Sequence, residues 1–295
     1  MRRLKRVALI GVGLIGGSFA LALRRAGAAG TIVGVDRDVA ALQRAAELGV
    51  IDTAAESVSD AAKGADLVIV AVPVRAIGPV LHDVALSLDP AAVVTDVGST
   101  KGDVTRAARE ELRSLFPRFV PGHPIAGREA SGVDAATAEL FKGARVVLTP
   151  EADTAPDAVD IVRNCWEGAG ARVATLTAAD HDRIFAAVSH LPHLLSFALV
   201  SEFTGRENSA ELFSFAGGGF RDFTRIAGSS PEMWRDIALQ NREALLDELD
   251  RYGARLAVFR ELVDKGDGPG LQRLMTEARA MRQSLTPARR GPANE

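Results

Sequence analysis

A glycine-rich stretch near the start of the chain, VALIGVGLIGGSFALAL over residues 7–23, limits the folds open to this sequence. A short apolar run stops at Gly11, glycines recur at Gly13 and Gly16, and a second apolar run follows. This pattern predicts a strand, a tight turn and a helix. Gly11 permits the turn, Gly13 lets the backbone approach a diphosphate, and Gly16 lets the helix pack closely on its strand. The dinucleotide-binding residues expected here are Gly11, Gly13, Leu14, Ile15 and Gly16.

A carboxylate follows the next predicted strand, TIVGVD over residues 31–36. Asp36 lies twenty residues after Gly16, where the dinucleotide-binding pattern places the acceptor for the ribose 2′-hydroxyl. The cofactor expected is therefore NAD, with NADP disfavoured because a carboxylate repels a 2′-phosphate. Arg37 is the neighbouring residue that would contact such a phosphate if the assignment of Asp36 is wrong.

Composition restricts the cell compartment and the partners. The 295 residues are 47% hydrophobic, enough for two domain cores, and the net charge of −3 offers no general field for nucleic acid or an anionic membrane. Cys165 is the single cysteine, so no intrachain disulfide forms and a buried, unreactive thiol is expected. We expect a cytoplasmic protein with a small-molecule substrate, no nucleic-acid partner and no membrane-spanning stretch.

Strand and helix patterns alternate up to about residue 176. Apolar strands are predicted over residues 66–73 and 91–97, with helices between them, which is typical of a parallel sheet. Two further strands, over 145–150 and 171–176, are expected to complete this sheet. Val72 and Pro73 come at the carboxyl end of a strand, the edge where open α/β sheets hold their ligands, so both are predicted to lie beside the cofactor.

Two side chains near the same edge are candidates for the chemistry. Ser99 lies where strand 91–97 turns into a helix; it or Thr100 is a candidate N-cap, and its hydroxyl is expected near the nicotinamide. His123 lies between Gly122 and Pro124 at the end of a predicted strand. Its unperturbed pKa of about 6.5 suits a base that accepts a hydroxyl proton near neutral pH. Lys101, in the first turn of the helix, is expected to be solvated.

From about residue 177 helical periodicity replaces the strand signals, which predicts a Rossmann-like domain over residues 1–176 and an all-helical domain over 177–295. A long apolar helix includes Pro192 and bears three histidines. His190 and His193 share a helix face, but no third ligand stands at metal spacing, so no metal site is expected. The three histidines are His181, His190 and His193.

The remainder of the helical region suggests a carboxylate site and a dimer contact. A glycine-rich loop over 217–237 bears Arg221 and Arg225, which suit a bidentate grip on a carboxylate, although ion-paired surface arginines are the alternative. Apolar residues spaced by four and three over 245–263 predict a homodimer-forming helix, with an intrachain core as the alternative. The Pro-rich tail over 285–295 is expected to be disordered.

Six motifs, GVGLIGGS, DVGSTKG, GHPIAG, SHLPH, GGGFRDFTRIA and the strand ending in Asp36, occur in an order that resembles the prephenate/arogenate dehydrogenase family of tyrosine biosynthesis. The resemblance extends from about residue 5 to 285. It implies an NAD(P)-dependent oxidative decarboxylation in which hydride leaves ring C4 of a cyclohexadienol, C1 loses CO2 and the ring becomes aromatic.

The resemblance also implies residue roles. His123 of GHPIAG matches the residue that binds the C4 hydroxyl and takes its proton, and Ser99 matches its hydroxyl partner near the nicotinamide. Arg225 of FTRIA matches the arginine that grips the ring carboxylate. His193 and Glu129 match positions lining the substrate pocket. Arg128 departs from the small polar residue found in several members, and a second cation there favours the pyruvyl carboxylate of prephenate.

Three alternatives stay open at this point. The choice between prephenate and arogenate is not fixed, because both have a side-chain carboxylate and Glu129 suits the ammonium of arogenate. A β-hydroxyacid dehydrogenase or imine reductase has the same domain order, but those enzymes use a lysine where this chain has histidines. A dinucleotide-sensing protein without turnover needs neither His123 nor Arg225.

Overall fold

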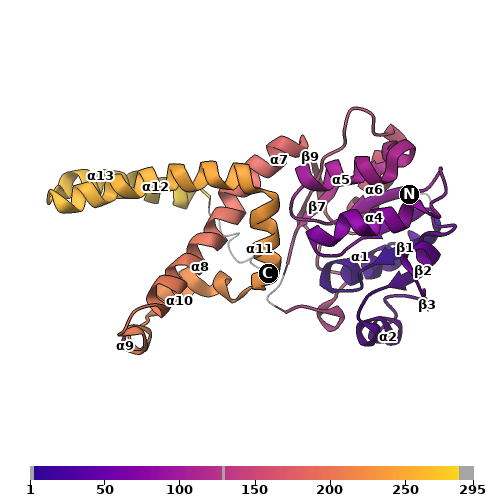
Figure 1. The fold of residues 1–295 in the computed structure, drawn as a ribbon, viewed down its shortest axis with the longest axis horizontal. Helices are drawn as coiled ribbons and strands as arrows, with labels where there is room; N and C mark the ends of the chain where they lie inside the picture. Colours follow the sequence, from indigo (N-terminus) through magenta and orange to yellow (C-terminus); the bar gives the residue numbers. More distant parts are fainter. Residues whose placement is uncertain (1–2, 128–129, 286–295) are drawn as a thin grey trace, which may run out of the picture. The chain divides into compact units, whose positions relative to one another are not determined.

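The computed structural model describes residues 3–127 and 130–285 (Figure 1). Contacts divide the chain into two compact units, one ending at Leu245 and the other beginning at Leu246. The candidate site lies within the first unit. Most of the tail for which disorder is expected, residues 286–295, lies outside the described residues.

Six parallel strands form the main sheet of the first unit, in the order β3-β2-β1-β4-β5-β6. They are β1 (Leu4–Ile10), β2 (Ala29–Val35), β3 (Thr53–Ala54), β4 (Leu67–Val70), β5 (Val93–Asp96) and β6 (Phe119–Val120). The strand order reverses between β1 and β4, so the loops after these two strands meet at the position where α/β folds bind their ligands.

Helices cover both faces of this sheet, as Figure 1 shows. One face packs against α1 (Leu14–Arg25), α2 (Val39–Glu47) and α6 (Pro156–Gly168), and the other against α3 (Val58–Ala62), α4 (Ile77–Ala85) and α5 (Gly102–Leu112). Phe19 of α1 stacks on Trp166 of α6 with ring centroids 3.7 Å apart. Cys165 is buried in α6, and burial raises the pKa of its thiol to about 12, as expected for an unreactive cysteine.

The last strands depart from the prediction, because they do not extend the main sheet. β7 (Gly122–Ile125), β8 (Arg145–Leu148) and β9 (Arg172–Thr175) form a separate sheet, with β7 antiparallel to β8 and β8 parallel to β9. The break falls at Pro121, which has no N–H to continue the ladder. Its carbonyl instead accepts a hydrogen bond from Thr149 N at 3.0 Å. His123 consequently lies inside β7 rather than at a strand end.

Beyond residue 176 the described chain is helical, which confirms the predicted class of a Rossmann-like parallel sheet followed by helices. The elements are α7 (Ala178–Phe185), a π-turn (Ala186–His190), α8 (Leu191–Thr204), α9 (Ser209–Ser214), α10 (Gly218–Thr224), a 3₁₀ turn (Arg225–Gly228) and α11 (Pro231–Gln240). Then come α12 (Arg242–Asp264), which passes from the first unit into the second, and α13 (Gly268–Ser284).

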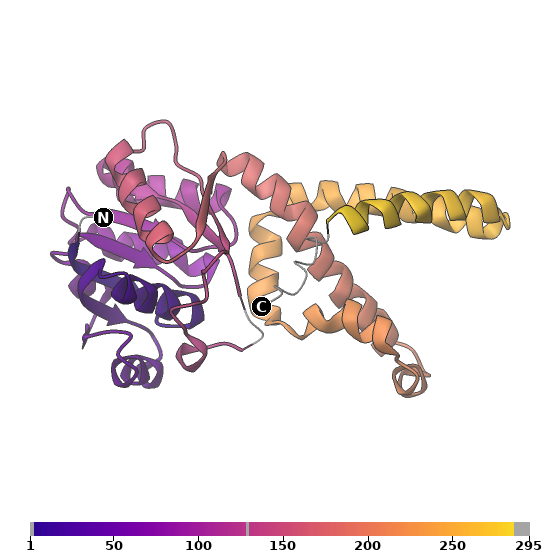
Figure 2. The same ribbon diagram turned by 180° about the vertical axis from the view of Figure 1, so that it is seen from behind.

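The long helix expected over the three histidines forms as one run, interrupted in its hydrogen bonding by the π-turn; Figure 2 shows it from behind. Pro192 explains the interruption, since a proline inside a helix lacks the N–H that bonds to the carbonyl four residues earlier and its ring crowds that carbonyl. A five-residue turn widens the helix at this point.

Two apolar features of the helical region bear on the predictions. Among the described residues one helical run, Ala178–Thr204, is long and apolar enough to cross a membrane, contrary to the expectation that no stretch approaches one. Three polar residues of this run, His181, His190 and Ser196, are buried, while 28% of its apolar window lies inside the protein. In the second unit the stripe on α12 is exposed, including Leu256 at 57% and Val263 at 66%.

Candidate active site

The glycine loop between β1 and α1 has the geometry that a dinucleotide requires. Gly11 has φ of +94°, and a Cβ there would collide with the carbonyl oxygen of Ala71. A Cβ on Gly16 would collide with the carbonyl oxygen of Gly11, so the helix packs against its own loop as predicted. Gly13 differs: a Cβ there would meet nothing within 4 Å, and Gly13 caps α1 without a side-chain hydrogen bond. The amide groups at the start of α1 are therefore available to a diphosphate.

Asp36 stands directly beside this loop. Its Oδ2 accepts a hydrogen bond from Val12 N at 2.9 Å, and its Oδ1 accepts one from Asp38 N at 3.0 Å. Each carboxylate oxygen has a second lone pair available for a ribose hydroxyl. Arg37 is exposed. The carboxylate is thus held in place at the end of β2, where the sequence predicted it.

The other predicted cofactor contacts gather around the loop. Leu14 and Ile15 form the first turn of α1 and are half-buried. Val72 follows β4 and lies against Gly11, whose added Cβ would come within 3.2 Å of Val72 Cγ1. Pro73 is exposed beside it, and Ser99 is half-buried on the turn after β5. The geometry is compatible with cofactor contacts at all five positions, but their roles stay predictions.

His123 is in contact with a second histidine. Its Nδ1 lies 2.8 Å from Nε2 of His181, and Phe185 packs against its ring at a centroid distance of 4.9 Å. Burial lowers the pKa of His123 well below 6.5, and the nearby His181, Lys101 and His190 lower it further. The pKa is therefore not the unperturbed value of about 6.5 expected from the sequence. The imidazole is neutral near pH 7 and has a nitrogen lone pair for a proton, but the lowered pKa makes it a weaker base than a free histidine.

Asp182 connects this pair to the nucleotide-binding fold. Nδ1 of His181 lies 2.8 Å from Oδ1 of Asp182, and the two oxygens of Asp182 accept hydrogen bonds from Lys101 N at 2.8 Å and Gly102 N at 2.7 Å. These are amides at the start of α5, so Asp182 caps that helix from a distant segment. The predicted cap by Ser99 or Thr100 is wrong. Thr100 Oγ1 instead donates to Gln240 Oε1 at 2.9 Å.

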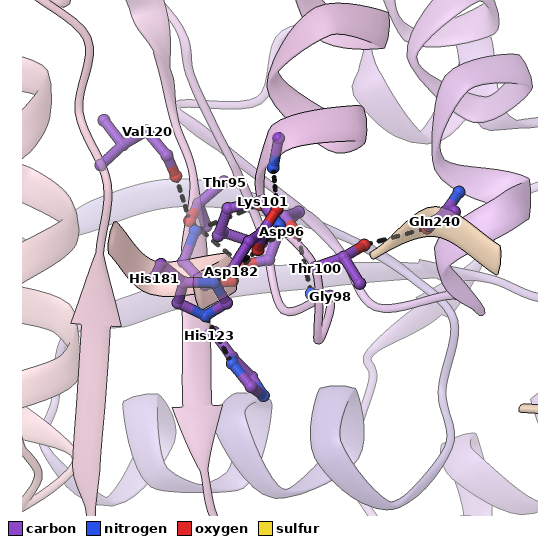
Figure 3. A network of polar contacts seen from close by, with 12 residues as sticks. Thr95, Asp96, Gly98, Thr100, Lys101, Val120, His123, His181, Asp182 and Gln240 are labelled. Carbon is purple, nitrogen blue, oxygen red and sulfur yellow. Dashed lines mark hydrogen bonds and ion pairs between the residues drawn. The ribbon is translucent and has the colours of Figure 1, made fainter. Parts of the chain in front are cut away.

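Lys101 is not solvated, contrary to the prediction. Its side chain is 0% exposed and forms an ion pair with Asp96, which is equally buried, and its Nζ donates to the carbonyl of Gly122 at 2.7 Å. Asp96 also accepts from Gly98 N and Gly122 N, at 2.7 and 3.1 Å. Figure 3 shows Lys101 and Asp96 directly beside Asp182 and His181. The pair joins β5, α5 and β7 next to the candidate base.

The other two histidines of the long helical run have partners of their own. His190 is buried, Asn241 Nδ2 donates to its Nδ1 at 3.0 Å, and burial lowers its pKa to about 4. His193 donates from Nδ1 to the carbonyl of Ser189 at 2.9 Å and stacks on Trp234 at a centroid distance of 3.6 Å. Within the described ranges no group of three or more His, Cys, Asp or Glu side chains is arranged to hold a metal ion.

The predicted substrate contacts are placed in part. Arg225 is exposed at the start of the 3₁₀ turn after α10, and its charge is close enough to lower the pKa of His193. Arg128 and Glu129 lie outside the described residues. Asn241 connects the two groups of side chains, because its Nδ2 lies 3.0 Å from His190 Nδ1 and 2.8 Å from the carbonyl oxygen of Asp182.

Sequence reasoning named His181 without giving it a role in catalysis, and it missed Asp182, Asn241 and the burial of Lys101. Asn241 closes the network, because its Nδ2 also donates to the carbonyl of Asp182 at 2.8 Å. Asp182 directly follows His181 in α7, but Asp180 and Arg183 flank the two residues, so the sequence did not mark Asp182 as a buried partner. The others come together only through contacts between distant segments.

A parallel sheet that presents a diphosphate-binding loop at its switch point, together with a neutral, half-buried histidine, defines the class of NAD(P)-dependent dehydrogenases. Comparisons with known proteins narrow this class. Residues 19–175 match the family model of the prephenate dehydrogenase nucleotide-binding domain, and residues 177–277 match that of the prephenate dehydrogenase dimerization domain. The chain therefore belongs to the prephenate dehydrogenase family.

Individual relatives agree with this assignment. A prephenate dehydrogenase of Bacillus subtilis is 39% identical over 97% of this chain and 77% of its own length. A cyclohexadienyl dehydrogenase of Zymomonas mobilis is 36% identical over 95% of this chain and 96% of its own. The crystal structure of the A. aeolicus prephenate dehydrogenase, in complex with hydroxyphenyl propionate and NAD+, is 36% identical, covers 97% of this chain and 99% of its own, and has a TM-score of 0.90.

Proposed function

We propose that the protein catalyses the NAD-dependent oxidative decarboxylation of prephenate to 4-hydroxyphenylpyruvate in tyrosine biosynthesis, with arogenate, which would give tyrosine, as the other candidate substrate. The observation that supports the chemistry most directly is His123, a neutral, half-buried imidazole with one ring nitrogen held by His181. A base of this kind receives the proton of a hydroxyl group as the adjacent carbon loses hydride.

The reaction balances with His123 as its one proton carrier. Bound NAD supplies the hydride acceptor. As hydride leaves ring C4, the C4 hydroxyl proton passes to His123. The bond from C1 to the carboxylate breaks, CO2 departs, and the electron pair of that bond enters the ring and makes it aromatic. The phenolic oxygen then regains the proton from His123. Since aromatisation drives the loss of CO2, the protein's main task is to hold the ring in position.

We assign the positioning of the substrate to the helical side of the site. Arg225 is proposed to grip the ring carboxylate, with His193 beside it, because a guanidinium offers a planar fork that matches a carboxylate. Ser99 is proposed as the hydroxyl partner of His123 near the nicotinamide. Glu129 and Arg128 are proposed to line the pocket near the substrate side chain.

The preference for NAD over NADP is proposed from Asp36. Its carboxylate is fixed beside the diphosphate loop by Val12 N, where it would accept the ribose hydroxyls and repel a 2′-phosphate. Val72 and Pro73 are proposed to flank the cofactor on the other side of the switch point.

We also propose a domain boundary, a homodimer and a cellular location. A nucleotide-binding domain over residues 1–176 precedes a helical domain over 177–295, which forms a homodimer through its exposed apolar surfaces. We place the protein in the cytoplasm, with no nucleic-acid or membrane partner.

One assay with both cofactors and both substrates tests these assignments. The purified protein is incubated with NAD or NADP and with prephenate or arogenate, and the absorbance of the reduced nicotinamide is followed. We expect reduction of NAD with prephenate, and its loss in the His123→Asn variant. Binding of NAD without turnover of either cyclohexadiene would favour a dinucleotide sensor and refute the proposal.

A further inference from the structure

We propose that His181 and Asp182 act as positioning residues that hold His123 in the tautomer with hydrogen on Nδ1, which leaves Nε2 as the base. The inference rests on the proposed function, because it concerns the residue assigned to take the substrate proton. Neither His181 nor Asp182 is offered as a contact of the substrate.

The polarity of the network follows from its hydrogen bonds. Asp182 accepts two backbone N–H groups, at 2.8 and 2.7 Å, so its ionised form is stabilised and it can only accept. Nδ1 of His181, 2.8 Å from Oδ1 of Asp182, must then be the donor. A neutral imidazole has one donor and one acceptor nitrogen, so Nε2 of His181 is an acceptor. His123 Nδ1, 2.8 Å away, must donate to it.

The protonation states that this requires are those that the surroundings favour. Burial lowers the pKa of His181 below 6.5 and outweighs the opposing effect of Asp182, so His181 is neutral near pH 7. The pKa of Asp182 is also lowered, by hydrogen bonds from His181, Gly102 and Lys101 that outweigh its burial. A doubly protonated His181 would reverse the polarity, because both of its nitrogens would then donate.

The charged and titratable groups that face this network come from three sides. Lys101 at the start of α5 and Asp96 at the end of β5 form a buried ion pair beside it, and His190 approaches from the π-turn. Because the lysine and aspartate charges offset each other, the carboxylate of Asp182 is the remaining negative charge. It favours the imidazolium that His123 becomes when it takes a proton, as the buried aspartate does in serine-protease triads.

Asp182 also makes the orientation of His123 depend on the position of α7. β7, which includes His123, packs against the nucleotide-binding fold, whereas His181 and Asp182 belong to α7. Asp182 caps α5, so the same carboxylate that orients the base fixes α7 against the start of that helix (Figure 3). Correct orientation of His123 therefore requires α7 in place.

The wild-type protein allows a direct test without turnover. With ¹⁵N-labelled histidine, the protonated and unprotonated ring nitrogens resonate far apart, and the chain has five histidines to resolve. The signals of His123 are identified by their loss in His123→Asn. We expect hydrogen on Nδ1 and a free Nε2 at pH 7.5, with and without NAD. Hydrogen on Nε2 would overturn the proposal, whether or not prephenate is the substrate.

Variants connect the tautomer to the rate. His181→Phe keeps a ring between His123 and Phe185 but has no nitrogen. We expect the His123 signals to shift toward a mixture of tautomers and kcat to fall roughly 10- to 100-fold, the range seen when a residue that orients a metal-ligating histidine is lost, with KM for prephenate and Kd for NAD nearly unchanged. Retention of both the tautomer and kcat would overturn the proposal.

A matched pair on α7 separates orientation from helix capping in general. Asp182→Asn introduces a donor that must oppose either a backbone N–H of α5 or Nδ1 of His181, so the tautomers of His181 and His123 should change. Asp180→Asn alters an exposed aspartate on the same helix, which interacts with Thr177 and Arg183, and should leave the signals and kcat unaltered. Equal spectra for the two variants would refute the proposal. Absence of turnover in the wild type would refute the proposed function alone.

Discussion

Replacing Lys101 by methionine removes a buried cation without removing its packing volume. Lys101 and Asp96 are both 0% exposed, and the lysine also donates to the carbonyl of Gly122. Methionine fills the space of the lysine side chain. It leaves the carboxylate of Asp96 buried with its two backbone N–H donors, Gly98 and Gly122.

The expected loss of stability is large. Removing one partner of a buried ion pair costs about 3–5 kcal/mol, because the remaining charge stays out of water. The two N–H groups on Asp96 moderate this effect, so we expect about 3 kcal/mol, a substantial share of a typical unfolding free energy of about 5–15 kcal/mol. The double variant Lys101→Met with Asp96→Asn has no buried charge and should recover part of the loss.

Urea unfolding followed by circular dichroism measures the difference, with Lys142→Met as the control. Lys142 is 77% exposed and lies 3.9 Å from Glu139, so its replacement should change the unfolding free energy by less than about 1 kcal/mol.

Two results would refute this reasoning. If Lys101→Met unfolds within about 1 kcal/mol of the wild type, the pair does not stabilise the junction of β5, α5 and β7. If the double variant is no more stable than Lys101→Met, the loss comes from packing around the lysine stem instead of from an unpaired carboxylate.

Further predictions concern the site itself. His123→Asn keeps a hydrogen bond but accepts no proton, so kcat should fall ~10²–10⁴-fold while KM changes little; near-normal turnover at every pH would remove His123 from the mechanism. Arg225→Ala should weaken substrate binding by about 2–5 kcal/mol, with NAD affinity by fluorescence titration unchanged; equal weakening of both ligands contradicts the clamp. Asp36→Ala should narrow the ratio of kcat/KM for NAD over NADP, and a wild type that prefers NADP would point to Arg37. The pKa of His190 is lowered to about 4 in the folded protein, below the value of about 6.5 for an unfolded chain. The free energy of unfolding should therefore decrease as the pH falls from 6.5 toward 4, and His190 should account for about 3 kcal/mol of that decrease. His190→Gln should flatten that decline in urea melts; an unchanged slope would show that another group causes it.

Local patterns predicted much of this protein because the features concerned are themselves local. Gly11, Gly13 and Gly16 lie within one strand-turn-helix unit, so spacing alone indicates their roles, and the position of Asp36 follows from the next strand. The alternation of strands and helices gave the parallel sheet for the same reason. The motifs around His123 and Arg225 named the family because they are specific in sequence.

The features that were missed depend on contacts between distant segments. A lysine in the first turn of a helix is ordinarily solvated, and Lys101 is buried only because β7 and Asp96 close over it. The cap of α5 comes from Asp182, 80 residues further along the chain, so the nearby hydroxyls of Ser99 and Thr100 were misleading. The separate second sheet results from Pro121, whose effect depends on which strand was available to pair with β7.

The π-turn before Pro192 determines how α8 is rotated about the helix axis relative to α7. An α-helix advances about 100° per residue, so a run that contains one residue more than the α-helical repeat turns the next helix by about that angle. His181 and Asp182 precede the turn and His193 follows it. Deleting a single residue between Ala186 and Ser189 would leave the composition of α8 intact but rotate His193 away from Trp234. The length of this segment, more than the identity of its residues, thus determines how the face of α8 with His193 is oriented relative to His181 and Asp182 of α7.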